Sequence, residues 1–145
     1  MKQRARLEPV HDIAQGAERS CAARVAGMEQ RLREAEQREQ ELRRYRAEYQ
    51  GGFETRMKSG ATVQSLRDFQ VFLARLGAAI DAQHGLCLQL AAECQRERQV
   101  LAAAIQRRQA LGKVIAKVHQ EERRMQDRQQ QHEQDERASQ SWVRP

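Results

Sequence analysis

Apolar side chains recur with a 3.5-residue period over two long stretches of the chain. In the first stretch, alternating steps of four and three residues give eleven positions, of which eight are apolar: Ala14, Glu18, Cys21, Val25, Met28, Leu32, Ala35, Glu39, Leu42, Arg46 and Tyr49. Most residues between them are Arg, Glu and Gln. This pattern predicts a helix over residues 6–50 whose apolar seam packs against a partner helix.

The second stretch keeps the same period for longer. Its seam has seventeen positions, of which thirteen are apolar: Phe69, Leu73, Leu76, Ile80, Gln83, Cys87, Leu90, Cys94, Glu97, Leu101, Ala104, Arg108, Leu111, Ile115, Val118, Glu122 and Met125. Helices of globular proteins rarely hold a strict heptad so long. The pattern predicts a second helix over residues 64–134.

Glycines mark the break between the two helices. Gly51 and Gly52 follow the first seam, and Gly60 lies a few residues further on. Glycine suits the left-handed conformation that ends many helices, and Thr62 or Ser65 is a suitable N-cap for the second helix. We therefore predict a turn over residues 51–63.

Two helices joined by a short turn pack most simply as an antiparallel hairpin. The predicted fold is all-α: a long two-helix antiparallel coiled-coil hairpin over residues 6–137, followed by a disordered tail over residues 138–145. In the predicted pairing, residue i of the first helix faces residue 118 − i of the second, so that Tyr49 faces Phe69.

This pairing leaves the C-terminal part of the second helix as an overhang, because the first helix has no residues left to pair beyond about residue 110. The apolar seam continues there through Leu111, Ile115, Val118 and Met125. An apolar seam without an internal partner is typical of a binding surface. Its predicted occupant is a second copy of the chain or another protein.

Composition supports a helical protein with little globular core. Of the 145 residues, 32% are charged and only 4% are aromatic, and the net charge is +6. Residues 1–50 hold eleven basic and nine acidic side chains, an interspersed pattern that does not favour a nucleic-acid-binding arm. No apolar run approaches the length of a membrane span, and no apolar segment of a secretory signal follows the basic start. We expect a cytosolic protein with its three cysteines reduced and no direct membrane insertion.

No catalytic or cofactor motif is evident. The segment GGFETRMKSG lacks the ending of a phosphate-binding P-loop. The four histidines are scattered, without the spacing of metal ligands. A two-helix hairpin also offers no cleft in which carboxylates acquire shifted pKa values. We therefore expect no enzyme activity, no cofactor and no metal.

All the tyrosines and phenylalanines of the chain flank the predicted turn: Tyr45, Tyr49, Phe53, Phe69 and Phe72. Seam packing accounts for Tyr49 and Phe69, but not for Tyr45 and Phe72. Rings beside a two-stranded coil suggest a partner site, because they supply much contact area at low entropic cost. The alternative is a hydrophobic plug that stabilises the turn.

The segments around the turn resemble the flagellar export protein FliJ family. The resemblance lies in the Y-x-x-E-Y step of YRAEY, the M-x-x-G of MKSG and the run FQVFLARLGAAI. The late segment EQDERAS is similar to the Asp-Glu-x-Ala of the family. Total length and the two heptad stretches agree with the same family.

The resemblance implies a non-enzymatic stalk of the flagellar type III export apparatus. Such a stalk would bind the hexameric export ATPase, promote its assembly and activity, and link it to the export gate membrane protein. Some family members also bind export chaperones. The implied location is cytoplasmic, at the inner-membrane base of the flagellum. The alternatives are the equivalent stalk of a virulence type III secretion system and a self-associating structural coiled coil.

Two groups of site residues follow from the resemblance. The group expected to meet the export gate is here named the tip cluster: Leu42, Tyr45, Tyr49, Phe72, Leu76 and Ala79. Family proteins usually add a Gln and a His, where this chain has Arg38 and Gln83 followed by His84. The group expected to meet the ATPase ring is the C-terminal seam: Leu111, Ile115, Val118 and Met125.

Overall fold

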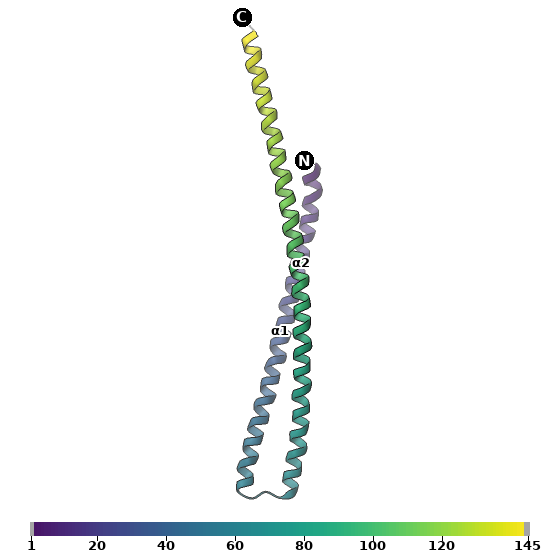
Figure 1. Cartoon of the computed structure of the whole chain (residues 1–145), viewed down its shortest axis with the longest axis vertical. Helices are drawn as coiled ribbons and strands as arrows, with labels where there is room; N and C mark the ends of the chain where they lie inside the picture. Colours follow the sequence, from purple (N-terminus) through teal and green to yellow (C-terminus); the bar gives the residue numbers. More distant parts are fainter. Residues whose placement is uncertain (1, 144–145) are drawn as a thin grey trace. The chain divides into compact units, whose positions relative to one another are not determined.

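Two α-helices and a short turn make up residues 2–143, the part of the chain described by a computed structural model. Helix α1 spans Lys2–Lys58 and helix α2 spans Val63–Val143 (Figure 1). No strand occurs in this range. The predicted all-α fold of two long helices is therefore confirmed.

The helices divide between two compact units. The turn unit comprises Ala22–Val100, and the end unit comprises Met1–Cys21 together with Leu101–Pro145. In the turn unit, the two helical segments are joined by the turn and run antiparallel. In the end unit, the first residues of α1 pack beside a later stretch of α2, where Arg4 contacts His119 and Glu18 contacts Arg108.

The apolar seam forms the core of the turn unit. Every predicted seam position from Val25 to Tyr49 and from Phe69 to Glu97 is buried or half-buried. Ile80 and Cys94 are each only 1% exposed. The central cluster consists of Ala35, Cys87 and Leu90, with Met28 and Leu32 packed against it. The predicted heptad seam is thus the packing interface of this unit.

The turn lies later than the sequence predicted. Helix α1 continues through Gly51 and Gly52 to Lys58, and α2 begins at Val63. Each glycine costs about 1 kcal/mol in a helix relative to alanine. Continuation of the helix places Phe53 against Phe69, with ring centroids 3.7 Å apart in a stacked arrangement. Burial of two rings offsets the cost of the glycines, so the predicted turn over residues 51–63 was wrong.

The helix ends beside the turn use specific caps. Gly60 has a φ of 92° and donates its N–H to Met57 O at 3.2 Å, which closes α1. Thr62 Oγ1 accepts a hydrogen bond from Ser65 N at 3.1 Å. Of the two predicted N-caps, the structure selects Thr62, and Ser65 is the third residue of α2.

The end unit corrects the predicted pairing beyond residue 110. Because α1 begins at Lys2 and the turn lies later, α1 reaches further along α2 than expected. Leu111, Ile115 and Val118 are half-buried rather than unpartnered, and half-burial on α2 extends to Glu122. On α1 the matching seam continues backward by the same steps from Ala14 through His11, Leu7 and Arg4.

The overhang of α2 is shorter than predicted and more polar. Every described residue from 123 to 143 is exposed. The helix nonetheless continues through Val143, where the sequence led us to expect a disordered tail from residue 138. Side-chain contacts between residues four apart occur along this part of the helix. Gln131 donates a hydrogen bond to Asp135, and His132 Nε2 lies 3.1 Å from Glu136 Oε1. The last two residues of the expected tail lie outside the described range.

Within the described residues, neither α1 nor α2 contains a stretch that combines the length and the apolar character of a bilayer-crossing helix.

Candidate protein-docking surfaces

The five rings near the turn form one connected group, here named the ring cluster. Tyr49 lies at its centre, 5.3 Å from Phe69 and 4.4 Å from Phe72 between ring centroids. Tyr45 meets Phe72 edge-on at 6.1 Å, and Phe53 stacks on Phe69. Offset and edge-to-face pairs stabilise by about 0.5–1.5 kcal/mol each beyond their burial. The Phe53–Phe69 pair lies face to face instead, with 6° between the ring planes, and contributes through burial. The cluster therefore holds α1 and α2 together beside the turn.

The tip cluster divides into accessible and inaccessible members. Tyr45 is 50% exposed and Ala79 is exposed, whereas Leu76 is only 7% exposed. The other three members are half-buried: Leu42, Tyr49 and Phe72. A partner that binds this face meets Tyr45, Ala79 and the outer edges of the half-buried side chains. Leu76 belongs to the core and supports the surface from below.

Polar residues beside the tip cluster are engaged within the turn unit. Gln83 Nε2 donates to Ala35 O at 2.9 Å. His84 Nδ1 lies 2.7 Å from Glu39 Oε1, and Arg43 Nε donates to the other oxygen of that carboxylate at 3.0 Å. These hydrogen bonds, first from His84 and then from Arg43, lower the pKa of Glu39. Gln83 and His84 therefore set the pairing of the helices rather than standing free for a partner.

The C-terminal seam offers less surface than the sequence suggested. Met125 is 70% exposed, while Leu111, Ile115 and Val118 are half-buried against α1. A shallow apolar cavity nevertheless lies at the edge of the seam. Its lining consists of Gln3, Arg6, Leu7, Val114 and Val118.

Exposed aliphatic side chains accompany this cavity. Val10, Ile13 and Val114 are 39%, 72% and 46% exposed. The predicted first seam begins at Ala14 and therefore omits this surface. Residues before that position carry a visible signal, since Leu7 lies one heptad before Ala14.

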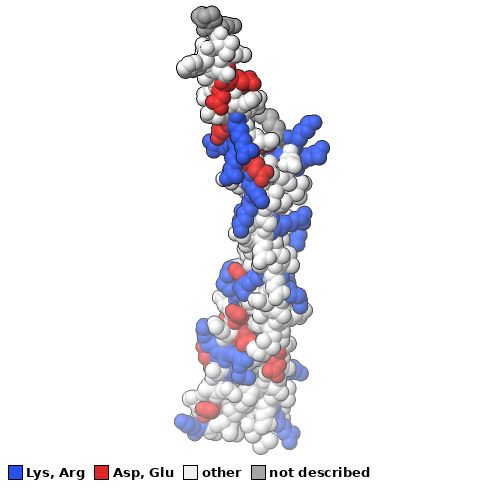
Figure 2. Space-filling model, turned by 45° about the horizontal axis from the view of Figure 1, so that its top comes forward, with Lys and Arg blue, Asp and Glu red and all other residues white. Residues whose placement is uncertain are grey.

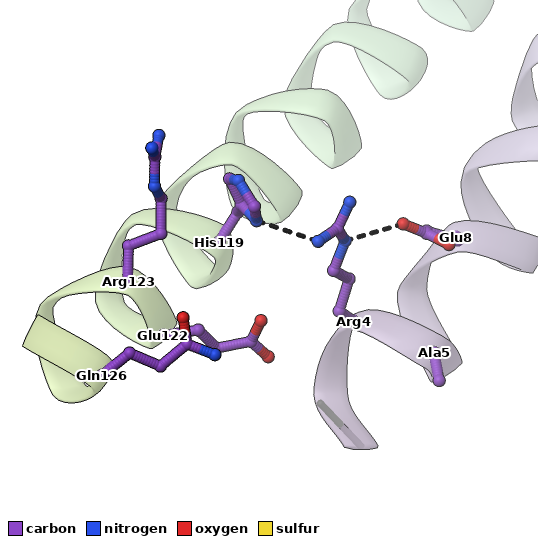
Figure 3. Close-up of a pocket in the computed structure, with 7 residues that line it drawn as sticks. All are labelled: Arg4, Ala5, Glu8, His119, Glu122, Arg123 and Gln126. Atoms are coloured by element: carbon purple, nitrogen blue, oxygen red, sulfur yellow. Dashed lines mark hydrogen bonds and ion pairs between the residues drawn. The ribbon is translucent and has the colours of Figure 1, made fainter. Parts of the chain in front are cut away.

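A polar pocket lies between the helices of the end unit (Figure 3). Arg4 occupies its middle and donates to Glu8 Oε1 at 2.8 Å and to His119 Nδ1 at 2.9 Å. Glu122, Arg123 and Gln126 complete its α2 side. Further along the same unit, Arg108 forms an ion pair with Glu18. Polar contacts between α1 and α2 thus contribute much of the helix pairing in the end unit.

Positive charge gathers in the end unit. Residues 2–8 and 107–128 together hold ten Lys and Arg against four Asp and Glu. Figure 2 shows blue side chains grouped in the upper part of the drawn face, with red side chains among them and above them. A surface of this kind attracts acidic partners and raises their rate of association.

Side chains with nucleophilic or metal-binding potential do not converge in the described part of the chain. No group of three or more His, Cys, Asp or Glu with metal-binding geometry occurs among these residues. Cys21, Cys87 and Cys94 are free and buried. Burial, followed by the charges of Glu39 and Glu36, raises the pKa of Cys87, which keeps its thiol protonated and unreactive.

Comparison with protein families gives a match that covers nearly the whole chain. The family described as Flagellar FliJ protein matches residues 2–145, essentially the whole chain. Comparison with curated proteins found no match, and comparison with solved structures found none either. The family is one of non-catalytic, export-related flagellar components, and a match of this extent decides membership. The chain therefore belongs to the flagellar FliJ family.

Proposed function

We propose that the chain is a non-enzymatic stalk that couples the flagellar export ATPase to the export gate. The observation that carries this proposal is the end unit, where a basic helix pair with exposed aliphatic side chains continues as a free helix over residues 123–143. Such a surface suits the interior of an acidic protein ring. The stalk acts by contacts that favour the assembled ring over separate subunits.

The ATPase ring contacts the C-terminal seam through its accessible members in this proposal. Met125 and the outer edge of Val118 supply apolar contact, supported by Ile13 and Val114. Leu111 and Ile115 act indirectly, because they hold α1 against α2. The surrounding basic residues meet acidic loops of the ring.

The tip cluster is the proposed contact for the export gate. Tyr45 and Ala79 are accessible, and Phe72 presents an edge beside Tyr45. Export chaperones are a further class of partner for the same stalk. Contact with the gate would bring the protein to the cytoplasmic side of the inner membrane without membrane insertion.

Two observations bear on the alternatives to a flagellar stalk, which are a virulence secretion stalk and a self-associating coiled coil. The family match supports the flagellar apparatus over a virulence secretion system. Self-association through the overhang is disfavoured because the heptad positions that follow Met125 are mainly polar: Gln129, His132, Glu136 and Ser139. A helix with such positions lacks the apolar seam of a homodimeric coiled coil.

ATP turnover by the cognate flagellar export ATPase tests the proposal. Addition of about one chain per six ATPase subunits should raise turnover and ring formation. A chain that ends after Glu122 should keep the packed hairpin, as measured by circular dichroism, yet lose most of the stimulation. A matched chain that ends after Arg137 should retain it. Failure of the full-length chain to stimulate or to co-elute with the ATPase would show that the coupling role is wrong.

A further inference from the structure

A groove runs along the turn unit beside the tip cluster. Arg31 and Arg38 of α1 line one side, and Leu86 of α2 lines the other, with Ala35 and Leu90 at the base. Leu86 is 40% exposed, whereas Ala35 and Leu90 are each 5% exposed. The groove therefore has an apolar side at Leu86, two guanidinium groups on the opposite side, and a well-packed base.

The groove continues the accessible face of the tip cluster. On α1, Arg31, Arg38 and Tyr45 are seven residues apart, and on α2 Phe72, Ala79 and Leu86 have the same spacing. Residues one heptad apart lie on one side of a coiled-coil helix. Tyr45 touches Phe72 at one end, and Arg38 lines the same groove as Leu86 at the other. The combined surface spans about 21 Å from Phe72 to Leu86 at ~1.5 Å per residue.

The positive charge of the groove is only partly offset within the described residues. Neither Arg31 nor Arg38 forms an ion pair with a carboxylate of residues 2–143, and Arg31 only approaches the sulfur of Met28 at 3.7 Å. Glu34 also lines the groove and accepts a hydrogen bond from the neutral Gln30, so one carboxylate stands against two guanidinium groups and the groove stays net positive. Guanidinium groups beside an apolar contact favour a partner that carries both carboxylates and apolar side chains. The carboxylates bind the guanidinium groups while the apolar side chains cover the apolar contact.

The backbone decides the form of the occupant. All residues on both sides of the groove are helical, so their N–H and C=O groups are used within α1 and α2. An extended strand would find no backbone partners here. A third helix can place its own side-chain ridges between those of the first two.

We propose that the tip cluster and this groove form one surface that receives an amphipathic helix of the partner, with an apolar stripe over Phe72, Ala79 and Leu86 and acidic residues toward Arg31 and Arg38. This inference rests on the proposed contact between the tip cluster and the export gate. It adds Leu86 and Arg31 to that contact, gives a role to the arginine that stands at position 38, and assigns the chemistry of the segment that binds. The occupant is an acidic amphipathic helix about four turns long.

Paired leucine variants test the apolar part of the surface. The probe is the purified cytosolic region of the cognate export gate, titrated against the full chain by calorimetry. Leu86→Ala should weaken binding about tenfold, as for a central apolar contact. Leu88→Ala removes a side chain that is 60% exposed but lies off this heptad stripe. It should leave binding within about twofold.

Matched charge reversals test the acidic part. The double variant Arg31→Glu with Arg38→Glu should weaken binding about tenfold at low salt, and the difference should narrow at high salt. The control double variant Arg24→Glu with Arg44→Glu has the same net charge and should bind nearly as the natural chain does. Circular dichroism of all four variants checks that the hairpin is intact.

The outcomes separate this inference from the proposed function. Loss of gate binding in Tyr45→Ala, with normal binding by Leu86→Ala and by the Arg31/Arg38 double variant, would confine the contact to the tip cluster and overturn the inference alone. Normal binding by Tyr45→Ala and Leu86→Ala together, or no binding by the natural chain, would overturn both. Weakening by Leu86→Ala and by the Arg31/Arg38 variant, but not by their controls, would support the extended surface.

Discussion

The turn unit and the end unit use one heptad pattern in two different ways. The turn unit buries large apolar side chains such as Ile80 and Leu90, at 1% and 5% exposure. In the end unit the buried side chains are the small ones of Ala14 and Cys21, and polar residues such as Arg4 and Arg108 complete the seam. Burial of apolar area stabilises by about 25 cal/mol per Å², so the turn unit has the stronger helix pairing. Equal periodicity therefore does not mean equal stability.

Hydrogen exchange should show the largest difference between the parts. Backbone amides at 123–143 belong to a helix without tertiary packing, which is marginal in water. We expect them to exchange within about tenfold of the unfolded rate, and seam amides of the turn unit to exchange at least about a thousandfold more slowly. The end-unit amides should be intermediate. Equal protection over the whole of α2 would show that the helix opens as one cooperative segment.

The same substitution in the two units should give unequal losses of stability. Ile80→Ala removes a side chain that is 1% exposed and should lower the free energy of unfolding by about 3 kcal/mol. Ile115→Ala removes a half-buried side chain and should lower it by about 1 kcal/mol. Urea denaturation followed by circular dichroism measures both. Similar losses would contradict the difference in packing.

Glycine substitutions within the turn unit should change its stability in opposite directions. A Cβ added at Gly51 or Gly52 meets no atom within 4 Å, and both residues are helical. Each change to alanine should raise the free energy of unfolding by about 1 kcal/mol. Gly60 also has open space, but its φ of 92° disfavours any side chain, so Gly60→Ala should lower stability by about 1 kcal/mol. Thermal unfolding of the three variants gives the signs directly.

The smallest expected effect is a pH dependence in the turn unit. Hydrogen bonds from His84 and Arg43 lower the pKa of Glu39 in the folded chain below its ordinary value of 4.5. A lowered folded pKa means that this stabilisation is present above the ordinary pKa and is lost as the pH falls through the folded pKa. Glu39→Gln should therefore lose less stability than the natural chain on acidification below pH 4.5. Glu41→Gln, at an exposed position of α1, should leave the acid-induced loss unchanged.

Periodicity predicted the helices well because seam burial is a regular, repeated effect. Of the seam positions named from the sequence, only Met125 is fully exposed. The turn was predicted too early because helix propensity counts only the cost of two glycines inside a helix. It does not include the stacking of Phe53 on Phe69, which offsets that cost. Such ring contacts depend on residues from both helices, and no local pattern contains them.

The error at the turn carried through to the predicted overhang. An early turn and a late start for α1 left Leu111, Ile115 and Val118 without partners, although α1 covers them in the structure. The tip cluster was proposed by resemblance, and its partner remains a prediction. The burial of Leu76 and the hydrogen bond from Gln83 to Ala35 require the helix pair itself, so the sequence alone does not contain them.

The cross-helix polar contacts of the turn unit have a mechanical consequence. A pure heptad seam would allow one helix to slide along the other by seven residues with similar apolar packing. Gln83 with Ala35 O, and at the surface Arg98 with Glu29 and His84 with Glu39, disfavour such a slip, because it breaks these contacts and leaves the half-buried Gln83 amide without its partner. We therefore expect the turn unit to keep a fixed register under an axial push or pull, so that the load is passed along its helices instead of being absorbed by slippage.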